Sequence, residues 1–304
     1  MLVFTMHLIL PALCVVAMWF SAPAWSVIWW EVFAITHALL AWPVYMGNWS
    51  WVGTPLRWIF PAALIAATYH SAGWPGAAVS VAAILVLVGF PLTRLRITAP
   101  RAQAIPLSLP FSEGLYYVGQ GGHTKLLNHH ILLRQQKYAV DFLRLNEART
   151  RCLGLYTPHL DRYSIYGATV ASPCDGEVTH VVDDSPDFIP PQTDRQHPTG
   201  NFILVRYHDS PDMYVLLAHL QQGSALVREG ERVQAGQPIA RVGNSGNTTE
   251  PHLHIQIKKG GQPDKWGDGE GLPMLFGGRF LIRGDTMRAA NPSAYRETVS
   301  AAGF

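Results

Sequence analysis

Apolar residues dominate the first part of this chain of 304 residues. Residues 1–92 contain only two Asp, Glu, Lys or Arg side chains, Glu31 and Arg57, whereas a soluble domain of that size carries many more. Tryptophans gather near the ends of the apolar stretches, which is typical of a membrane interface. We therefore predict an α-helical transmembrane region of about four helices over residues 1–93, with three helices as the alternative. The stretches that approach membrane-crossing length are residues 2–20, 27–46, 56–72 and 77–92.

The second part of the chain alternates short apolar runs with turn residues. Residues 94–110 contain several prolines and are predicted to form a linker. Beyond them, β-branched and aromatic runs are bounded by Gly, Pro and Asp, which is the pattern of β-strands. This spacing predicts an antiparallel all-β domain over residues 111–285, followed by a C-terminal tail over residues 286–304. The runs are residues 137–143, 168–182, 201–207, 213–220, 231–242 and 252–258.

Two connections between these runs have a distinctive composition. Residues 234–237, with the sequence Gln-Ala-Gly-Gln, lie between two strand-like stretches and are predicted to form a hairpin turn. Residues 183–198 are too rich in proline and polar side chains for a strand. They predict either a solvated loop or a flap that borders a substrate groove.

Charge and cysteine content narrow the possible functions. The formal net charge of +2 is too small to favour nucleic acid as a partner, and no basic run suggests one. The three cysteines include no Cys-x-x-Cys pair, which argues against a closed structural zinc site. Cys152 and Cys174 both lie in the predicted β domain, where they form either a disulfide in an oxidising compartment or two free thiols. The sequence gives no indication of the oligomeric state.

Candidate chemistry centres on the tripeptide His252-Leu253-His254. If this segment is a β-strand, residues two apart point to the same face, so both imidazoles lie on one side of a sheet. Histidine and aspartate ligands with one position left for water are typical of catalytic zinc. The pattern therefore favours a hydrolytic zinc site over a structural one.

Three motifs in this order resemble the lysostaphin-type zinc metallopeptidases: Tyr-Ala-x-Asp-Phe ending at Phe142, Ala-His-Leu around His219, and Pro-His-Leu-His ending at His254. The resemblance covers about residues 110–285. It implies the lysostaphin-like β-sandwich, also called the duplicated hybrid motif, and one zinc ion. It further implies that Asp141 and His254 bind zinc, while His219 and His252 carry protons and stabilise the oxyanion.

The chain departs from the common family pattern at one position. That pattern places a first histidine four residues before the aspartate, and here the position is Lys137, whose protonated ammonium cannot bind zinc. The replacement candidates are His123, His129 and His130. Similarity to members that carry Asn-x-His before a longer loop implies His130, with His129 as second choice.

One polar residue outside these motifs is a secondary candidate. Asn201 follows Gly200 and precedes an apolar run, so it could simply complete a turn. In the family, a polar residue near this point sometimes supports the zinc site. The sequence leaves both interpretations of Asn201 open.

The resemblance implies a membrane-anchored zinc endopeptidase that hydrolyses the peptide crosslinks of peptidoglycan. Its expected partners are peptidoglycan or another peptide and the lipid bilayer, with the catalytic domain outside the cytoplasmic membrane. Arg94, Arg96 and Arg101 oppose this orientation, because positive residues favour the cytoplasmic side. The alternatives are a metal-free relative that binds wall peptides or activates a partner hydrolase, and a zinc peptidase with a membrane-proximal protein substrate.

Overall fold

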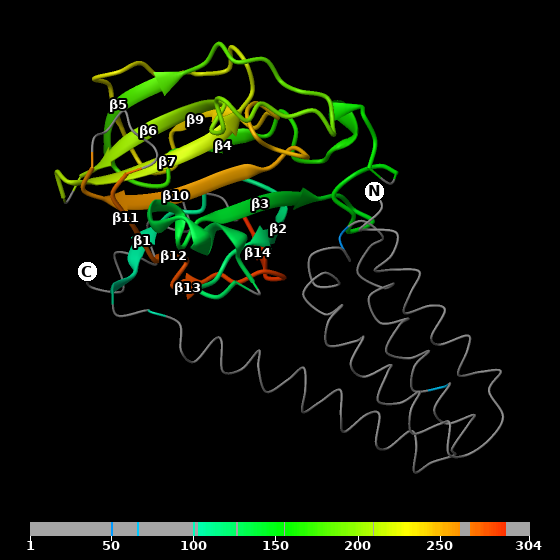
Figure 1. Ribbon diagram of the computed structural model, residues 1–304, viewed down its shortest axis with the longest axis horizontal. Helices are drawn as coiled ribbons and strands as arrows, with labels where there is room; N and C mark the ends of the chain where they lie inside the picture. Colours follow the sequence, from blue (N-terminus) through cyan, green and yellow to red (C-terminus); the bar gives the residue numbers. More distant parts are fainter. Residues whose placement is uncertain are drawn as a thin grey trace. The chain divides into compact units, whose positions relative to one another are not determined.

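The computed structural model describes residues 103–289, except 126, 155, 209 and 262–267, together with the isolated positions Ser50, Ala66 and Pro100. The chain divides into two units, residues 1–98 and 99–304. All strands with assigned bounds belong to the second unit (Figure 1).

The predicted α-helical transmembrane bundle is not supported. In the part of the chain that the structure describes, no helix is long and apolar enough to cross a membrane. The helices given bounds there are 3-10 helices of three or four residues. The predicted spans within residues 1–93 lie outside the described residues, except for Ala66. The predicted fold class is therefore wrong in its helical part: it rested on apolar composition, which does not by itself establish a long helix.

The described chain is built from β-strands joined by loops. The 3-10 helices are η5 (His129–Leu132), η6 (Arg134–Gln136) and η7 (Leu160–Arg162). The strands are β1 (Ile105–Leu107), β2 (Leu115–Gln120), β3 (Val140–Leu145), β4 (Thr169–Ala171), β5 (Gly176–Val182), β6 (Asn201–Tyr207), β7 (Met213–Leu220), β8 (Arg232–Val233), β9 (Pro238–Arg241), β10 (Leu253–Lys259), β11 (Glu270–Leu272), β12 (Met274–Phe276), β13 (Arg279–Phe280) and β14 (Thr286–Arg288). Strands β1 and β14 lie in the segments that were assigned to the linker and the tail.

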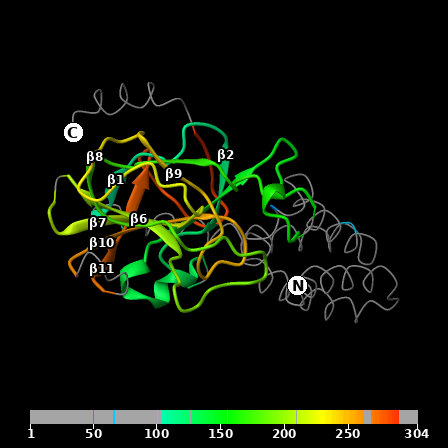
Figure 2. The ribbon, with the colours of Figure 1, turned by 90° about the horizontal axis from the view of Figure 1, so that it is seen from above.

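A nine-stranded sheet organises the domain, in the order β14-β2-β3-β10-β7-β6-β5-β8, with β11 added beside β10. Its pairings are antiparallel, which agrees with the predicted all-β domain. Two small sheets, β1-β12-β13 and β4-β9, complete the described architecture. Figures 1 and 2 both show β7 and β10 side by side near the middle of the large sheet.

The main hydrophobic core uses one face of the large sheet. Leu253, Ile255 and Ile257 of β10 belong to this core, together with residues of β4 and β9 such as Val170 and Ile239. Because side chains alternate along a strand, the even-numbered residues of β10 lie on the opposite face. A smaller apolar cluster covers part of that face: Phe202, Leu204, Tyr214, Leu216 and Ala218.

Two predicted strand runs are each divided between different sheets. Residues 168–182 form β4 and β5, while residues 231–242 form β8 and β9. Residues 234–237 do form a turn, in which the amide of Gln237 donates to the carbonyl of Gln234 at 2.9 Å. The turn is not a hairpin, however, because β8 pairs with β5 and β9 pairs with β4.

Residues 183–198 form a loop that is attached to the domain through Asp187. Its carboxylate accepts hydrogen bonds from the amide of Asn244 at 2.6 Å and the hydroxyl of Tyr166 at 3.1 Å. The loop is thus fixed to the turn that follows β9, close to the residues that support His219.

The sequence left open whether Cys152 and Cys174 form a disulfide. Both are buried, and they are not joined in a disulfide.

Candidate metal centre

The register between β3 and β10 places two predicted ligands opposite each other. Asp141 of β3 pairs with His254 of β10, and residues that face each other across an antiparallel pair share a face of the sheet. The Nδ1 atom of His254 lies 3.0 Å from Oδ1 of Asp141. Both side chains are buried on the face away from the main core.

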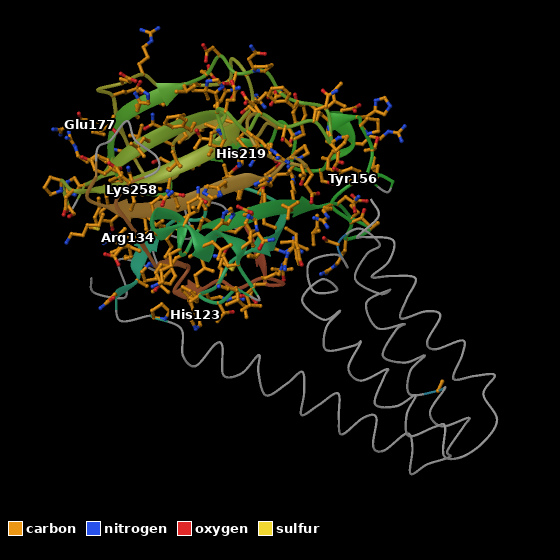
Figure 3. All side chains as sticks on the ribbon, viewed as in Figure 1. His123, Arg134, Tyr156, Glu177, His219 and Lys258 are labelled. Carbon is orange, nitrogen blue, oxygen red and sulfur yellow. The ribbon has the colours of Figure 1, made fainter. Side chains whose placement is uncertain are left out.

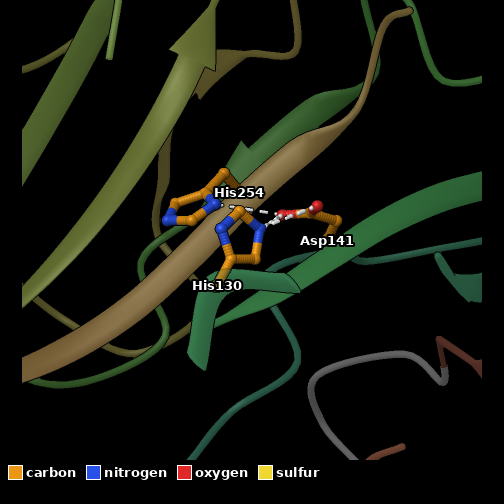
Figure 4. A group of neighbouring side chains, drawn as sticks. All are labelled: His130, Asp141 and His254. Carbon is orange, nitrogen blue, oxygen red and sulfur yellow. Dashed lines mark hydrogen bonds and ion pairs between the residues drawn. The ribbon is translucent and has the colours of Figure 1, made fainter. Parts of the chain in front are cut away.

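His130 completes a group of three side chains, which we call the ligand group: His130, Asp141 and His254 (Figure 4). The Nε2 atom of His130 lies 3.0 Å from Oδ2 of Asp141. One ligand atom from each residue falls within 4.8 Å of the other two. Two imidazole nitrogens and a carboxylate oxygen form a donor set that suits zinc and leaves room for a fourth ligand.

The electrostatics of the ligand group favour an ionised aspartate. Burial, the largest single influence, would raise the pKa of Asp141. The charges of His130 and His252 and the hydrogen bonds from His130 and His254 lower it, and in sum they outweigh burial. Together they hold the pKa of Asp141 well below its usual range. A negative carboxylate is therefore held between two imidazoles, as binding of a cation requires.

Asn128 fixes the position of His130. Its side-chain oxygen accepts a hydrogen bond from the His130 amide at 3.1 Å, at the N-terminus of η5. Its amide group donates to the carbonyls of Gly122 at 3.1 Å and Ala139 at 3.0 Å. The fully buried Asn128 thus joins the His130 loop to the start of β3.

Replacing Asn128 by alanine is expected to loosen the His130 loop. The substitution removes three hydrogen bonds to backbone groups. Two of these groups, the carbonyls of Gly122 and Ala139, are buried, and each unsatisfied buried group costs about 1–3 kcal/mol. Hydrogen–deuterium exchange over residues 122–140 should accelerate by at least about tenfold. Asn128→Asp, which keeps the acceptor but loses both donors, should lie between wild type and Asn128→Ala; unchanged exchange in Asn128→Ala would contradict this role.

A β-bulge turns His219 toward the ligand group. Ala218 of β7 pairs with His254, so regular alternation would direct the next residue to the opposite face. Instead, the register between β6 and β7 shifts beside His219, whose backbone adopts a left-handed φ of 63°. A bulge of this kind re-aims a side chain, and the His219 ring lies 4.7 Å from that of His252 and 5.9 Å from that of His254. Figure 3 shows His219 near the end of β7.

The backbone fixes the tautomers of His219 and His252. Nδ1 of His219 lies 2.9 Å from the carbonyl oxygen of Ser245, and Nδ1 of His252 lies 2.8 Å from that of Glu250. A carbonyl oxygen only accepts hydrogen bonds, so each Nδ1 carries the proton. In the neutral form of either ring the lone pair is then on Nε2. Nε2 of His252 lies 3.8 Å from Oδ1 of Asp141.

Burial reinforces the neutral state of His219. It lowers the pKa of His219 well below its usual range, and the neighbouring His252 and His254 lower it further. The ring is therefore an uncharged hydrogen-bond partner at neutral pH.

The remaining sequence candidates lie outside the ligand group. His129 is exposed, with its ring centroid 4.0 Å from that of His130. Asn201 is fully buried and binds the backbone of Ser185 and Leu220, so it supports the fold beneath His219. His123 packs against Phe280, and Lys137 lies over Tyr138.

Sequence reasoning missed the residues that support this centre. They are Asn128, Gln136, Ser245, Thr248 and Gln256. The sequence held a signal for one of them, because Gln256 lies two residues after His254 and shares its face of the strand. The contacts of the others cross loops, which no periodic pattern reveals.

Comparison with known proteins finds one family model that matches part of the chain. Residues 160–265 match the model for Peptidase family M23. The M23 match contains His219, His252 and His254, whereas His130 and Asp141 precede it. The resemblance to the lysostaphin-type peptidases is thereby confirmed at the level of the family.

Part of this chain is similar to parts of several curated relatives. Peptidoglycan DD-endopeptidase ShyA of Vibrio cholerae is 33% identical over 70 residues, 23% of this chain and 15% of ShyA. Murein hydrolase activator EnvC of Escherichia coli is 50% identical over 46 residues, 14% of this chain and 11% of EnvC. Lipoprotein NlpD of Yersinia enterocolitica is 38% identical over 63 residues, 21% of this chain and 60% of NlpD. The chain thus spans less than two thirds of the length of each.

Solved structures align with part of this chain at low identity. The catalytic domain of lysostaphin from Staphylococcus simulans is 21% identical, with 43% of this chain and 74% of that chain covered at a TM-score of 0.28. A zinc containing peptidase from Vibrio cholerae is 19% identical, with 60% of this chain and 40% of that chain covered at a TM-score of 0.28.

Proposed function

We propose that this chain is a zinc-dependent endopeptidase that hydrolyses the peptide crosslinks of peptidoglycan. The observation that carries the proposal is the convergence of five side chains on one point of the sheet face. Three of them, the partly buried His130 and the buried Asp141 and His254, form a donor set for a metal ion. The other two, His219 and His252, present basic Nε2 atoms beside it.

His130, Asp141 and His254 would hold the zinc ion. A bound zinc ion supplies Lewis acidity, which activates water and polarises the carbonyl of a scissile peptide bond. The aspartate contributes the negative charge that offsets part of the metal charge, and its burial keeps competing water away.

His219 and His252 would move protons and stabilise charge. Their Nδ1 protons are committed to the Ser245 and Glu250 carbonyls, so Nε2 of each ring is the atom that reacts. One imidazole can take a proton from the attacking water and pass it to the leaving amine. The other, once protonated, can donate a hydrogen bond to the oxyanion.

The substrate class rests on the relatives and on the family. ShyA carries the name peptidoglycan DD-endopeptidase, and the M23 match covers three of the five side chains in the centre. We therefore assign peptidoglycan peptides as the substrate of this centre.

Metal analysis and metal removal test the proposal. The purified full chain should contain about one zinc ion per molecule and should cleave crosslinked muropeptides. A chelator should abolish cleavage, and added zinc should restore it. Absence of zinc from the purified protein, or cleavage that survives complete zinc removal, would refute the proposal.

A second candidate function is activation of a partner hydrolase without metal. The similarity to the part of EnvC that matches favours it, as does Lys137 at the place of the usual first histidine. An activator would lack zinc and would stimulate a cell-wall hydrolase without cleaving muropeptides itself. The same metal analysis therefore separates the two functions.

A further inference from the structure

Each histidine of the ligand group has a second ring nitrogen that points away from Asp141, and both of these nitrogens meet a glutamine. Nδ1 of His130 lies 3.1 Å from Oε1 of Gln136. Nε2 of His254 lies 3.0 Å from Oε1 of Gln256. The two ligand histidines thus have the same kind of partner, supplied by two separate elements.

Both glutamines are held rigidly in the interior. Gln136 is 7% exposed and Gln256 is 1% exposed. Gln136 ends η6, which packs against β10 and β11, while Gln256 lies within β10 on the face that carries His254. Buried side chains on packed elements can hold an imidazole in one orientation.

The amide oxygens determine which nitrogen of each histidine is available to a metal ion. An amide oxygen only accepts, so Nδ1 of His130 and Nε2 of His254 must carry the protons. When the two rings act as neutral metal ligands, lone pairs on Nε2 of His130 and Nδ1 of His254 take the place of the protons that these atoms donate to Asp141. These are the atoms that approach Asp141, at 3.0 Å each. The two histidines therefore need opposite tautomers, and each glutamine selects the one required.

Gln256 keeps this orientation at a cost to the fold. Its Nε2 is buried and has no hydrogen-bond partner among the described residues. An unsatisfied buried donor destabilises a protein and calls for an explanation beyond packing. Rotating the amide would direct NH2 at Nε2 of His254 and move the ring proton to Nδ1, which would block the atom that faces Asp141. The requirement of His254 for an acceptor explains the orientation.

We propose that Gln136 and Gln256 are positioning residues that fix the tautomer and ring orientation of the two histidine ligands. This inference rests on the zinc site proposed above. A neutral amide orients the ring without the extra negative charge of a carboxylate, and so leaves the bound metal more electrophilic. The pair thus supports the Lewis acidity that peptide hydrolysis requires.

Zinc affinity of the full chain tests this role by competition with a chromophoric chelator. Gln136→Met and Gln256→Met preserve side-chain length but remove the acceptor. Each should weaken zinc binding by about 10–100-fold, as expected when the partner of a ligand histidine is lost. Gln135→Met is the matched control, because Gln135 is a neighbouring residue of η6 that is 5% exposed. In the described chain its side chain makes no hydrogen bond to a histidine of the ligand group.

Cobalt substitution provides a second readout that packing alone would not change. The visible absorption bands of the cobalt-loaded protein should shift in Gln136→Met and Gln256→Met but not in Gln135→Met. Gln136→Glu and Gln256→Glu restore an acceptor and should recover zinc affinity to within about threefold of wild type. If a methionine variant fails to fold, the corresponding glutamate variant decides: its stronger acceptor should shift the cobalt bands, and unchanged bands would overturn the role.

The outcomes separate this inference from the proposed function. The positioning role alone would be overturned if the wild type binds zinc and the methionine variants behave like it. Their zinc affinities would then lie within about twofold of wild type, and their cobalt bands would be unchanged. Failure of the wild type to bind zinc would overturn both proposals together.

Discussion

Replacing His130 by alanine is expected to remove zinc from the purified protein and to abolish muropeptide cleavage. His130 supplies one of the three donor atoms of the ligand group. It lies in the 3-10 helix η5, whereas the other two ligands lie in strands. Loss of a ligand should weaken binding by more than the roughly 10–100-fold expected for loss of a residue that only orients a ligand. Elemental analysis after gel filtration measures the effect directly.

Two neighbouring substitutions control for this experiment. His129→Ala removes the adjacent exposed imidazole, which lies outside the ligand group, and should leave the zinc content near wild type. Lys137→Ala removes the side chain at the usual position of the first histidine and should also leave zinc in place. Zinc retained in His130→Ala but lost in His129→Ala would assign the third ligand to His129 and contradict the arrangement in Figure 4.

The strand-borne part of the centre could be predicted from sequence because it depends on alternation. His254 lies in β10, His252 directly precedes this strand, and Asp141 lies in the adjacent β3. Alternation places each on a known face once its strand is recognised. The pairing of β3 with β10 was not available from sequence, since it joins segments more than 100 residues apart.

Other features depend on local breaks in regular structure. His130 is placed by a capped 3-10 helix, and its family-based assignment could not show what holds it. Residues 168–182 are split between β4 and β5 by the Pro173–Gly176 turn. The hydrophobic pattern did not reveal this turn and predicted one continuous run. At Gly176 an added Cβ would lie 2.3 Å from the Arg206 carbonyl oxygen, so only glycine fits where β5 begins. Such close approaches are set by the partner strand and leave no period in the sequence.

The contrast between His254 and His219 shows where alternation fails. Regular pairing would have turned the His219 side chain away from the ligand group, and a bulge with a left-handed residue reverses this. Non-glycine residues in this conformation carry strain of about 1–2 kcal/mol, and such strain gathers at functional sites. The family resemblance suggested a role for His219, but only the backbone explains how that role is possible.

Replacing His219 is therefore expected to separate catalysis from metal binding. His219→Ala should lower the rate of muropeptide cleavage by about 10²–10⁴-fold, the usual contribution of a general acid or base. The zinc content should stay at wild-type level, because His219 is not in the ligand group. A variant that loses zinc, or one that cleaves at the wild-type rate, would contradict the proton-transfer role.

A glycine variant at the same position tests the backbone argument independently. His219→Gly should be as inactive as His219→Ala, but more stable than His219→Ala by about 1 kcal/mol, because glycine adopts a φ of 63° without strain. Urea denaturation measures the difference between the two variants. Added imidazole should restore part of the activity of His219→Gly, since the space left beside His252 accepts a free ring. Equal stability of the two variants would show that the left-handed backbone at position 219 relaxes when the histidine is removed, and that the imidazole contacts, rather than the bulge, maintain it.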